Sequence, residues 1–231
     1  MYLLIAISVV LLILFMVWAS ADVGSNVYLK TICKAVTKEK LVALTFDDGP
    51  DEATSKVLDV LKKHNIQATF FLVGSKVEKH PEIVKRIVAE GHIVGNHTYW
   101  HSGYFPLSGA KKTEHDITKC SAAIQKVTGK KPMLFRPPFG VTNPNIGKAV
   151  RALGLKTIGW SIRSLDTVKG KTREEVAETV IKNLHAGAII LLHDRCQEAD
   201  SLVEKIIVGA REKGYSFASL EKMTNIQAYE N

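Results

Sequence analysis

Two adjacent aspartates, Asp47 and Asp48, stand where an apolar run at 41–44 meets the pair Gly49-Pro50. The run is typical of a buried strand, and the Gly-Pro pair is typical of the turn that ends one. Two like charges side by side cost free energy unless a cation, an arginine or a proton offsets them. The aspartate pair therefore predicts partners of that kind elsewhere in the chain.

Two histidines supply the next candidates. His97 and His101 follow a short apolar segment at 92–94. They are four residues apart, so one helical turn would bring both imidazoles to the same side. Two histidines and one carboxylate form a common ligand set for a catalytic divalent cation, with positions left for water and substrate. Alone, the spacing also fits two surface histidines; joined to the aspartate pair, it predicts a metal site.

An arginine and a third histidine complete the set. Arg136 precedes a double proline, which is stiff and holds the arginine in a fixed direction, so that it could pair with Asp47 and favour its charged form. His193 directly follows the wholly apolar segment 188–192. Such a histidine is often merely a hydrogen-bonded core residue. Because His193 shares its end of the sheet with the other candidates, we expect it to transfer a proton.

The elements that must position these side chains alternate along the chain. Periodicity predicts strands at 26–32, 41–46, 67–73, 92–94, 133–136, 157–160, 188–192 and 215–219. It predicts helices at 54–64, 81–90, 107–128, 145–153, 172–185 and 200–213. Repeated strand–helix units imply an α/β fold with a parallel sheet, and chemistry then lies at the carboxyl ends of the strands. Six to eight such units in this length favour a compressed (β/α) barrel over an open doubly wound sheet.

Composition narrows the class of partner. The chain has 231 residues, with 31 Lys and Arg against 23 Asp and Glu, a formal charge of +8. The basic residues are scattered without an aromatic-interleaved stripe, which argues against nucleic acid as a partner. A mildly basic surface suits solubility, a wall polymer or lipid headgroups. Three cysteines, Cys33, Cys120 and Cys196, are too few for a disulfide framework.

The amino-terminal segment is apolar and uncharged from residue 2 to residue 18. As a helix it would be about 27 Å long, close to the thickness of a bilayer core. A transmembrane anchor is one interpretation, and a signal peptide cleaved after Ala-Ser-Ala at 19–21 is the other. The missing basic n-region and the length of the run favour the anchor. Either segment would deliver the rest of the chain outside the cytoplasm.

Four motifs, at 45–50, 97–101, 136–140 and 191–193, occur together in this order. In this respect the sequence from about 38 to 223 resembles the polysaccharide deacetylase family (NodB-homology domain, carbohydrate esterase family 4). The resemblance implies a distorted (β/α)7–8 barrel and metal-dependent removal of acetyl groups from sugars. We accordingly divide the chain into a membrane or signal segment at 1–21, a spacer at 22–39 and a NodB-homology domain at 40–224.

The resemblance also implies a ligand set. Carried onto the matching positions, Asp48, His97 and His101 hold one divalent metal ion. Zn²⁺ is the expected ion, with Co²⁺, Ni²⁺ and Mn²⁺ as alternatives. A metal of this kind lowers the pKa of a bound water toward ~7, which makes a nucleophile at neutral pH.

The implied acid–base chemistry uses five further groups. Asp47 is the general base, and Arg136 orients it. The backbone N–H of Phe139 stabilises the oxyanion, and His193 is the general acid. Asp166 is available to orient His193. The products would be acetate and a free amino sugar.

One motif departs from the family pattern. The family usually has Asp-x-x-Asp-Trp, but here Arg163 replaces the first aspartate and Thr167 replaces the tryptophan, while Asp166 is kept. The change affects substrate contacts more than the chemistry. We expect three residues to line the substrate pocket: Trp100, Pro138 and Leu191.

The function expected from these residues is hydrolysis of acetyl groups on N-acetylated sugars of a polysaccharide, such as peptidoglycan or a chitin-like polymer. One alternative is a membrane-anchored glycan-binding protein with an inactive site, which the change at Thr167 motivates. Another is a deacetylase or deformylase of a lipid-linked sugar, which the apolar segment motivates. The membrane partner would be engaged through that segment. The sequence does not indicate an oligomeric state.

Overall fold

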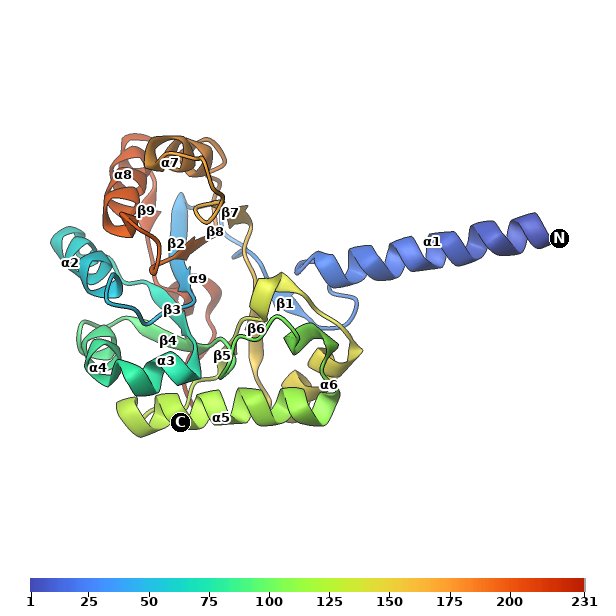
Figure 1. Cartoon of the computed structure of the whole chain (residues 1–231). Helices are drawn as coiled ribbons and strands as arrows, with labels where there is room; N and C mark the ends of the chain where they lie inside the picture. Colours follow the sequence, from blue (N-terminus) through green and yellow to red (C-terminus); the bar gives the residue numbers. More distant parts are fainter. Residues whose placement is uncertain (231) are drawn as a thin grey trace.

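The structure is a computed structural model that describes residues 1–230 (Figure 1). Its core is a parallel sheet. The strands are β1 (Thr31–Ile32), β2 (Leu41–Asp47), β3 (Thr69–Leu72), β4 (Ile93–Asn96), β5 (Leu134–Phe135), β6 (Lys156–Ile158), β7 (Ile162–Arg163), β8 (Ala188–His193) and β9 (Ser216–Phe217). Their order is β1-β6-β5-β4-β3-β2-β8-β7, with β9 beside the start of β2.

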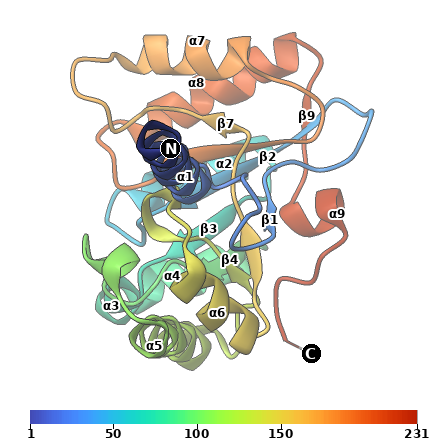
Figure 2. The ribbon, with the colours of Figure 1, turned by 90° about the vertical axis from the view of Figure 1, so that its right-hand side faces the viewer.

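Helices surround this sheet. They are α2 (Thr54–His64), α3 (Gly74–Lys79), α4 (Pro81–Ala89), α5 (Ala110–Thr128), α6 (Pro144–Ala152), α7 (Arg173–Lys182), α8 (Ala199–Glu212) and α9 (Leu220–Thr224), with short 3₁₀ turns η1 (Phe105–Leu107) and η2 (Pro138–Gly140). In the view down the amino-terminal helix, α7 and α8 lie above the sheet and α3 and α5 below it (Figure 2). The expected distorted (β/α) barrel is confirmed in an incomplete form, since β1 and β7 each pair with one strand among the described residues.

The central strands are buried because both of their faces are covered. β2 and β8 are buried along almost their whole length, are mostly apolar, and pair in register from Val42 beside Ala188 to Asp47 beside His193. Parallel strands that are buried on both faces are expected to be nearly continuous apolar runs. The register has a direct consequence for function, because it places Asp47 and His193 side by side at the carboxyl ends of neighbouring strands.

Local signals explain where several helices begin and end. The expected capping box of α7 is present: Thr172 Oγ1 accepts from Glu175 N at 3.2 Å, and Thr172 N donates to Glu175 Oε2 at 2.8 Å. α5 begins later than expected, at Ala110, because the preceding residues form η1. α3, α9 and β7 were not expected. They are short, so their periodicity is weak.

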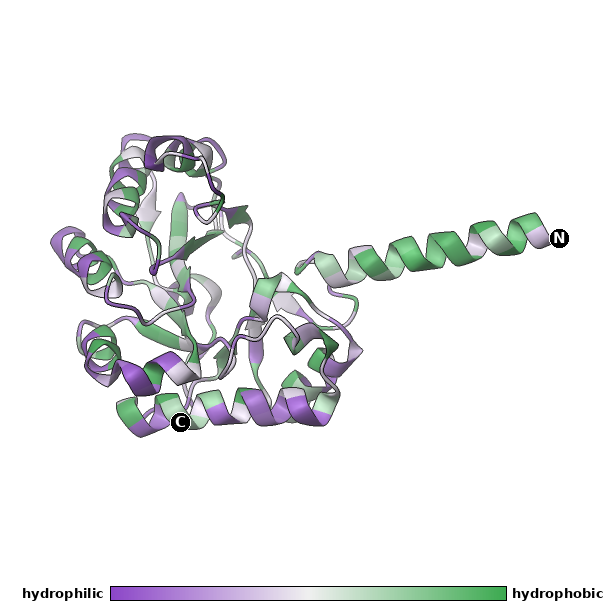
Figure 3. Cartoon of the chain, viewed as in Figure 1, coloured by the Kyte–Doolittle hydropathy of each residue, from purple (hydrophilic) through white to green (hydrophobic). Residues whose placement is uncertain are grey.

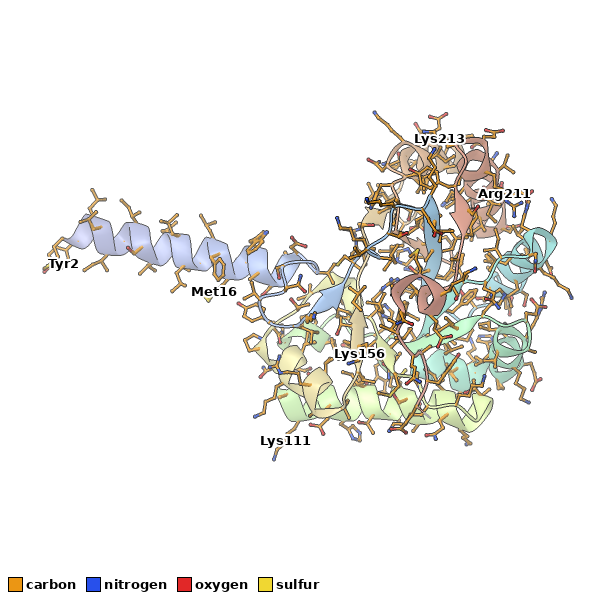
Figure 4. All side chains as sticks on the ribbon, turned by 180° about the vertical axis from the view of Figure 1, so that it is seen from behind. Tyr2, Met16, Lys111, Lys156, Arg211 and Lys213 are labelled. Carbon is orange, nitrogen blue, oxygen red and sulfur yellow. The ribbon has the colours of Figure 1, made fainter. Side chains whose placement is uncertain are left out.

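The segment 22–39, expected as a spacer, packs against the body of the protein. Val23 and Leu29 are buried, and β1 extends the edge of the sheet beside β6. The sequence pattern of residues 22–39 does not reveal this packing, because the residues are buried by contacts with distant segments of the chain. Lys111, Lys156 and Lys213 lie on different parts of the body (Figure 4).

The amino-terminal helix α1 (Tyr2–Ala21) projects away from this body (Figure 1). It is apolar along its length, with a mean hydropathy of 2.8 over 18 residues (Figure 3). Tyr2 and Met16 point into open space (Figure 4), whereas Ala19 is buried. By length and composition, α1 is able to cross a membrane.

Candidate active site

A buried arginine forms the floor of the site. Arg136 follows β5 and is fully buried. Its Nη1 donates to Asp47 Oδ1 at 2.7 Å and to Thr45 Oγ1 at 2.8 Å. Nε donates to the Ile158 carbonyl at 3.1 Å, and Nη2 donates to the Gly159 carbonyl at 2.7 Å. Burial lowers the pKa of Arg136, and the charge of Asp47 opposes that effect. The expected ion pair is therefore present, and it fixes one oxygen of Asp47.

Three side chains converge above this floor. Single ligand atoms of Asp48, His97 and His101 all lie within 4.8 Å of one another. Asp48 Oδ1 is 3.2 Å from Nε2 of His101 and 3.5 Å from Nε2 of His97. His97 Nδ1 is 2.8 Å from the Arg136 carbonyl. Because a carbonyl oxygen can only accept, Nδ1 is the donor, and the other ring nitrogen, Nε2, faces Asp48. One carboxylate and two imidazoles, each with a donor atom toward a common point, fit a divalent cation.

The protonation of these groups suits metal binding. Burial alone would raise the pKa of Asp48, but the hydrogen bond from His97 and the charges of His97, His101 and His193 outweigh it and hold that pKa well below its usual range. Burial, together with the neighbouring His97, lowers the pKa of His101 to about 4. His101 is therefore neutral at physiological pH, which is the form that binds a metal.

The turn that carries the two histidines is not helical, contrary to our expectation. Thr98 and His101 have positive φ angles of 67° and 46°. Thr98 Oγ1 accepts from His101 N at 3.1 Å and stabilises the turn. The same turn directs Trp100 outward, where it is 62% exposed and packs edge-on against Tyr99. Trp100, expected in the substrate pocket, instead lines a separate hollow.

The third histidine is held by an aspartate. His193 Nδ1 lies 2.8 Å from Asp166 Oδ1, and His193 N donates to Asp166 Oδ2 at 2.7 Å. Burial would lower the pKa of His193, but the hydrogen bond and charge of Asp166, with Asp47 and Asp48, raise it. His193 Nε2 is 4.0 Å from Asp48 Oδ2. A histidine of this kind stays protonated to a higher pH and can donate from Nε2.

These groups share one hollow of about 170 Å³. Its lining residues are Asp47, Asp48, His97, His101, Phe139, Gly140, Trp160, Arg163, Thr167, Leu191, His193 and Arg195. Arg136 and Asp166 are buried beneath it. Pro138, also expected in the pocket, is buried within η2 and is not among the described lining residues. Its neighbour Phe139, which has a left-handed backbone at φ 60°, is exposed and lines the hollow instead.

Sequence reasoning missed two lining residues. Trp160 packs over Gly140, where a Cβ atom would lie 2.5 Å from the tryptophan ring. Arg195 Nε donates to Asp48 Oδ2 at 2.9 Å, so Asp48 Oδ1 remains toward the histidines. Both residues follow within two positions of the end of a strand, β6 or β8. Their positions just after a strand could have identified them from the sequence, because loops at this edge of a parallel sheet hold functional side chains.

Within residues 1–230, the structure is a (β/α) scaffold with one candidate metal centre at the carboxyl ends of its strands. Residues 34–158 match the profile of the polysaccharide deacetylase family, and the chain belongs to this family. The resemblance drawn from the four motifs is thereby confirmed.

Two curated relatives are peptidoglycan deacetylases by name. The chain is 38% identical over 187 residues to a peptidoglycan-N-acetylglucosamine deacetylase of Bacillus cereus, covering 79% of this chain and 67% of the relative. It is 36% identical over 193 residues to the peptidoglycan-N-acetylmuramic acid deacetylase PdaA of Bacillus subtilis, covering 81% and 72%. A crystal structure of a peptidoglycan N-acetylglucosamine deacetylase aligns with a TM-score of 0.81 and 34% identity over 87% of this chain and 95% of that one.

The same fold also occurs without activity. A Bacillus anthracis protein described as a pseudoenzyme of the same carbohydrate esterase family aligns with a TM-score of 0.77 and 27% identity, over 84% of this chain and 68% of that one. Fold alone therefore does not establish turnover, and the side chains in the hollow must support it.

Proposed function

We propose that this protein is a metal-dependent deacetylase that removes acetyl groups from N-acetylated sugars of a wall glycan, with peptidoglycan as the first candidate. The observation that carries the proposal is the convergence of Asp48, His97 and His101 in one hollow, with Asp47 beside them and His193 facing them. The names of the two peptidoglycan deacetylases among the relatives support the choice of polymer.

The metal would be held by Asp48, His97 and His101, and Zn²⁺ is our first candidate because the donor set is one oxygen and two nitrogens. When bound, the ion would polarise the acetyl carbonyl and lower the pKa of a water. The protein's contribution is to hold the three donors in place. The Arg136 carbonyl does this for His97 through the hydrogen bond to Nδ1.

Asp47 is the general base in this proposal. Its Oδ1 is occupied by Arg136, so Oδ2 is the oxygen that would accept a proton from the attacking water. Arg136 acts as the positioning residue for this carboxylate. The backbone N–H of Phe139 would donate to the oxyanion, an effect worth ~3–4 kcal/mol per donor in comparable sites.

His193 is the general acid. Departure of an amine requires a proton, because an amide anion is a very poor leaving group, and general acid catalysis contributes ~10²–10⁴-fold. Asp166 holds Nδ1, so the proton is delivered from Nε2. The bond between the acetyl carbon and nitrogen breaks, and acetate and a free amino sugar result.

Acetate release tests the proposal. The zinc-loaded full-length protein in mild detergent is assayed on peptidoglycan fragments, chitin oligomers and acetylated xylan, with and without a chelator. We expect acetate from peptidoglycan fragments, with the corresponding loss of acetyl mass, and we expect chelation to stop it reversibly. Absence of acetate from every substrate with the metal loaded would contradict the proposal and favour an inactive, glycan-binding protein.

We further propose that α1 is a retained anchor and that residues 40–224 act outside the cytoplasm. α1 continues through the 19–21 segment, Ala19 is buried, and Thr142 donates to the carbonyls of Ala19 and Ser20. A cleavage site held in a docked helix is poorly accessible. The measurement is the amino-terminal sequence of the mature protein: retention of residues 1–21 supports an anchor, and a new terminus near residue 22 contradicts it.

A second candidate substrate is a lipid-linked acetylated sugar. The observation that favours it is the position of Thr142, which contacts α1 and lies two residues from Gly140 of the hollow. The site would therefore open near the bilayer if α1 is an anchor. Mass spectrometry of glycolipids and wall fragments from a deletion strain separates this candidate from the polymer.

A further inference from the structure

Two arginines line the mouth of the hollow, and the acid–base chemistry uses neither. Arg163 in β7 and Arg195 after β8 are both exposed and both line the hollow. Arg195 is engaged by Asp48. Among residues 1–230, Arg163 has neither a hydrogen-bond acceptor nor a carboxylate partner, so its guanidinium group is available to a ligand.

The charges of the hollow are unbalanced once a cation is present. Among the lining carboxylates and arginines, Asp47 and Asp48 contribute two negative charges and Arg163 and Arg195 contribute two positive charges, so these four cancel. Protonation of His193, which also lines the hollow, only adds positive charge. A divalent cation then adds two positive charges. Beneath the hollow, the positive charge of Arg136 is matched by the negative charge of Asp166. The hollow is therefore positive when loaded, which favours an anionic ligand.

The position of Arg163 places this charge beside the reacting groups. Arg163 pairs with Leu191 across β7 and β8, and His193 lies two residues further along the same strand. Thr167, which also lines the hollow, has a short side chain and leaves the guanidinium group accessible. A neutral acetylated sugar offers this group only hydroxyl oxygens. A carboxylate or a phosphate matches its planar fork with two parallel hydrogen bonds.

We propose that Arg163 is a specificity-determining residue that binds an anionic group on the acetylated sugar, either a carboxylate or a phosphate. The inference rests on the proposed function and names the substrate class of the same site. The anion has two possible sources: a carboxylate borne by an ether substituent of the sugar ring, or a phosphate at the anomeric carbon of a lipid-linked sugar.

The experiment compares probes that differ in charge. The first is a disaccharide of N-acetylglucosamine and N-acetylmuramic acid with its free carboxylate, and the second is the methyl ester of the same disaccharide. The third is N-acetylglucosamine 1-phosphate, with N-acetylglucosamine methyl glycoside as its neutral counterpart. For each probe, kcat/KM is measured from acetate release and Kd from calorimetry on the zinc-loaded full-length protein.

Three variants make the comparison specific. Arg163→Gln removes the charge, and Arg163→Lys keeps the charge without the planar fork. Lys126→Gln is the control, because Lys126 is exposed on α5 and outside the hollow and its replacement makes the same change in net charge.

We expect the wild-type protein to prefer at least one anionic probe over its neutral counterpart by about tenfold, the effect of one charged hydrogen bond. Arg163→Gln should bring that ratio close to one, Arg163→Lys should leave it intermediate, and Lys126→Gln should leave it unchanged. The ratio should also fall as salt is added, because the attraction is screened. The preferred probe identifies the source of the anion.

Failure of the inference differs from failure of the proposed function. The inference would be overturned, even if acetate is released, by either of two results. One is equal kcat/KM and Kd for the charged and neutral probes in the wild-type protein. The other is a charged-to-neutral ratio in Arg163→Gln that equals the wild-type ratio. If no probe releases acetate but Arg163→Gln selectively weakens binding of an anionic probe, the inference stands and the proposed hydrolysis fails.

Discussion

The floor and the rim of the hollow are built differently. The floor, formed by Arg136, Asp47 and His97, is buried, and backbone carbonyls hold its donors in place. The rim, which includes Arg163 and Arg195, is exposed and lies at or beyond the ends of β7 and β8. Packing fixes the groups proposed to do chemistry, whereas solvent surrounds those proposed to recognise the substrate.

Two arginines illustrate this difference, because each binds one aspartate of the adjacent pair. Arg136 has no exposed side-chain surface and binds Asp47, and Arg195 is 43% exposed and binds Asp48. An ion pair in a buried site interacts strongly, and loss of one partner leaves an uncompensated charge. Solvent around the exposed Arg195 screens its pair with Asp48, and Asp48 keeps its contacts with the two histidines, so the loss of Arg195 should cost only ~0–1 kcal/mol. Replacement of an arginine at the rim should therefore cost little stability.

The largest effect is expected from a variant that removes the buried ion pair of the floor. Arg136→Met keeps most of the volume but leaves Asp47 buried without its cation, so the free energy of unfolding should fall by about 3–5 kcal/mol. Arg195→Met is the matched variant at the rim and should lower it by less than about 1 kcal/mol. Urea unfolding of the full-length proteins in mild detergent measures both. Equal losses in the two variants would remove the distinction between floor and rim.

A second effect comes from an acid buried under the aspartate turn. Asp194 accepts a hydrogen bond from Thr54 at 2.6 Å, and burial raises its pKa from 3.8 to about 7. The folded state then binds more protons than the unfolded state between pH 4 and pH 7, so stability falls as pH rises through this window, by up to about 4 kcal/mol. Asp194→Asn should flatten that part of the curve of unfolding free energy against pH. Parallel curves for the variant and the wild type would show that Asp194 does not titrate there.

A third effect concerns the acid side of the site. Asp166→Asn should lower kcat about 100-fold, since the amide no longer holds His193 as an imidazolium. The pKa of His193 is raised mainly by Asp166 against the effect of burial, so the alkaline limb of the kcat profile should move to lower pH. Metal content should be unchanged. A variant with the wild-type profile would show that Asp166 does not position the acid.

The smallest effect is expected at the rim. Thr167→Trp introduces the aromatic residue usual in the family, which can stack on a sugar ring and contribute about 1 kcal/mol. KM for chitin oligomers should fall by a few fold, with kcat within about twofold. A collapse of kcat would place Thr167 among the groups that act in the chemistry.

The sequence predicts the floor better than the rim, for a physical reason. The ends of parallel strands must share one edge of the sheet, so motifs after β2, β4, β5 and β8 could be brought together from their order alone. α2 was predicted with the bounds that the structure shows, because its apolar residues follow helical spacing and its turn signals are clear.

Contacts that depend on tertiary packing were not predictable. The outward direction of Trp100 follows from positive φ angles at Thr98 and His101, which residue type does not reveal. The bond from Arg195 to Asp48 joins residues 147 positions apart and follows no spacing rule. The packing of segment 22–39 depends on β6 and α6, which lie far along the chain.

The adjacent aspartates give the most direct test of the account. Metal content and kcat are measured together for Asp47→Asn and Asp48→Asn, two isosteric changes one residue apart. Asp47→Asn should retain about one equivalent of Zn²⁺ while losing almost all turnover, and Asp48→Asn should lose the metal itself. Wild-type kcat in Asp47→Asn, or a full complement of zinc in Asp48→Asn, would contradict the assignment of base and ligand.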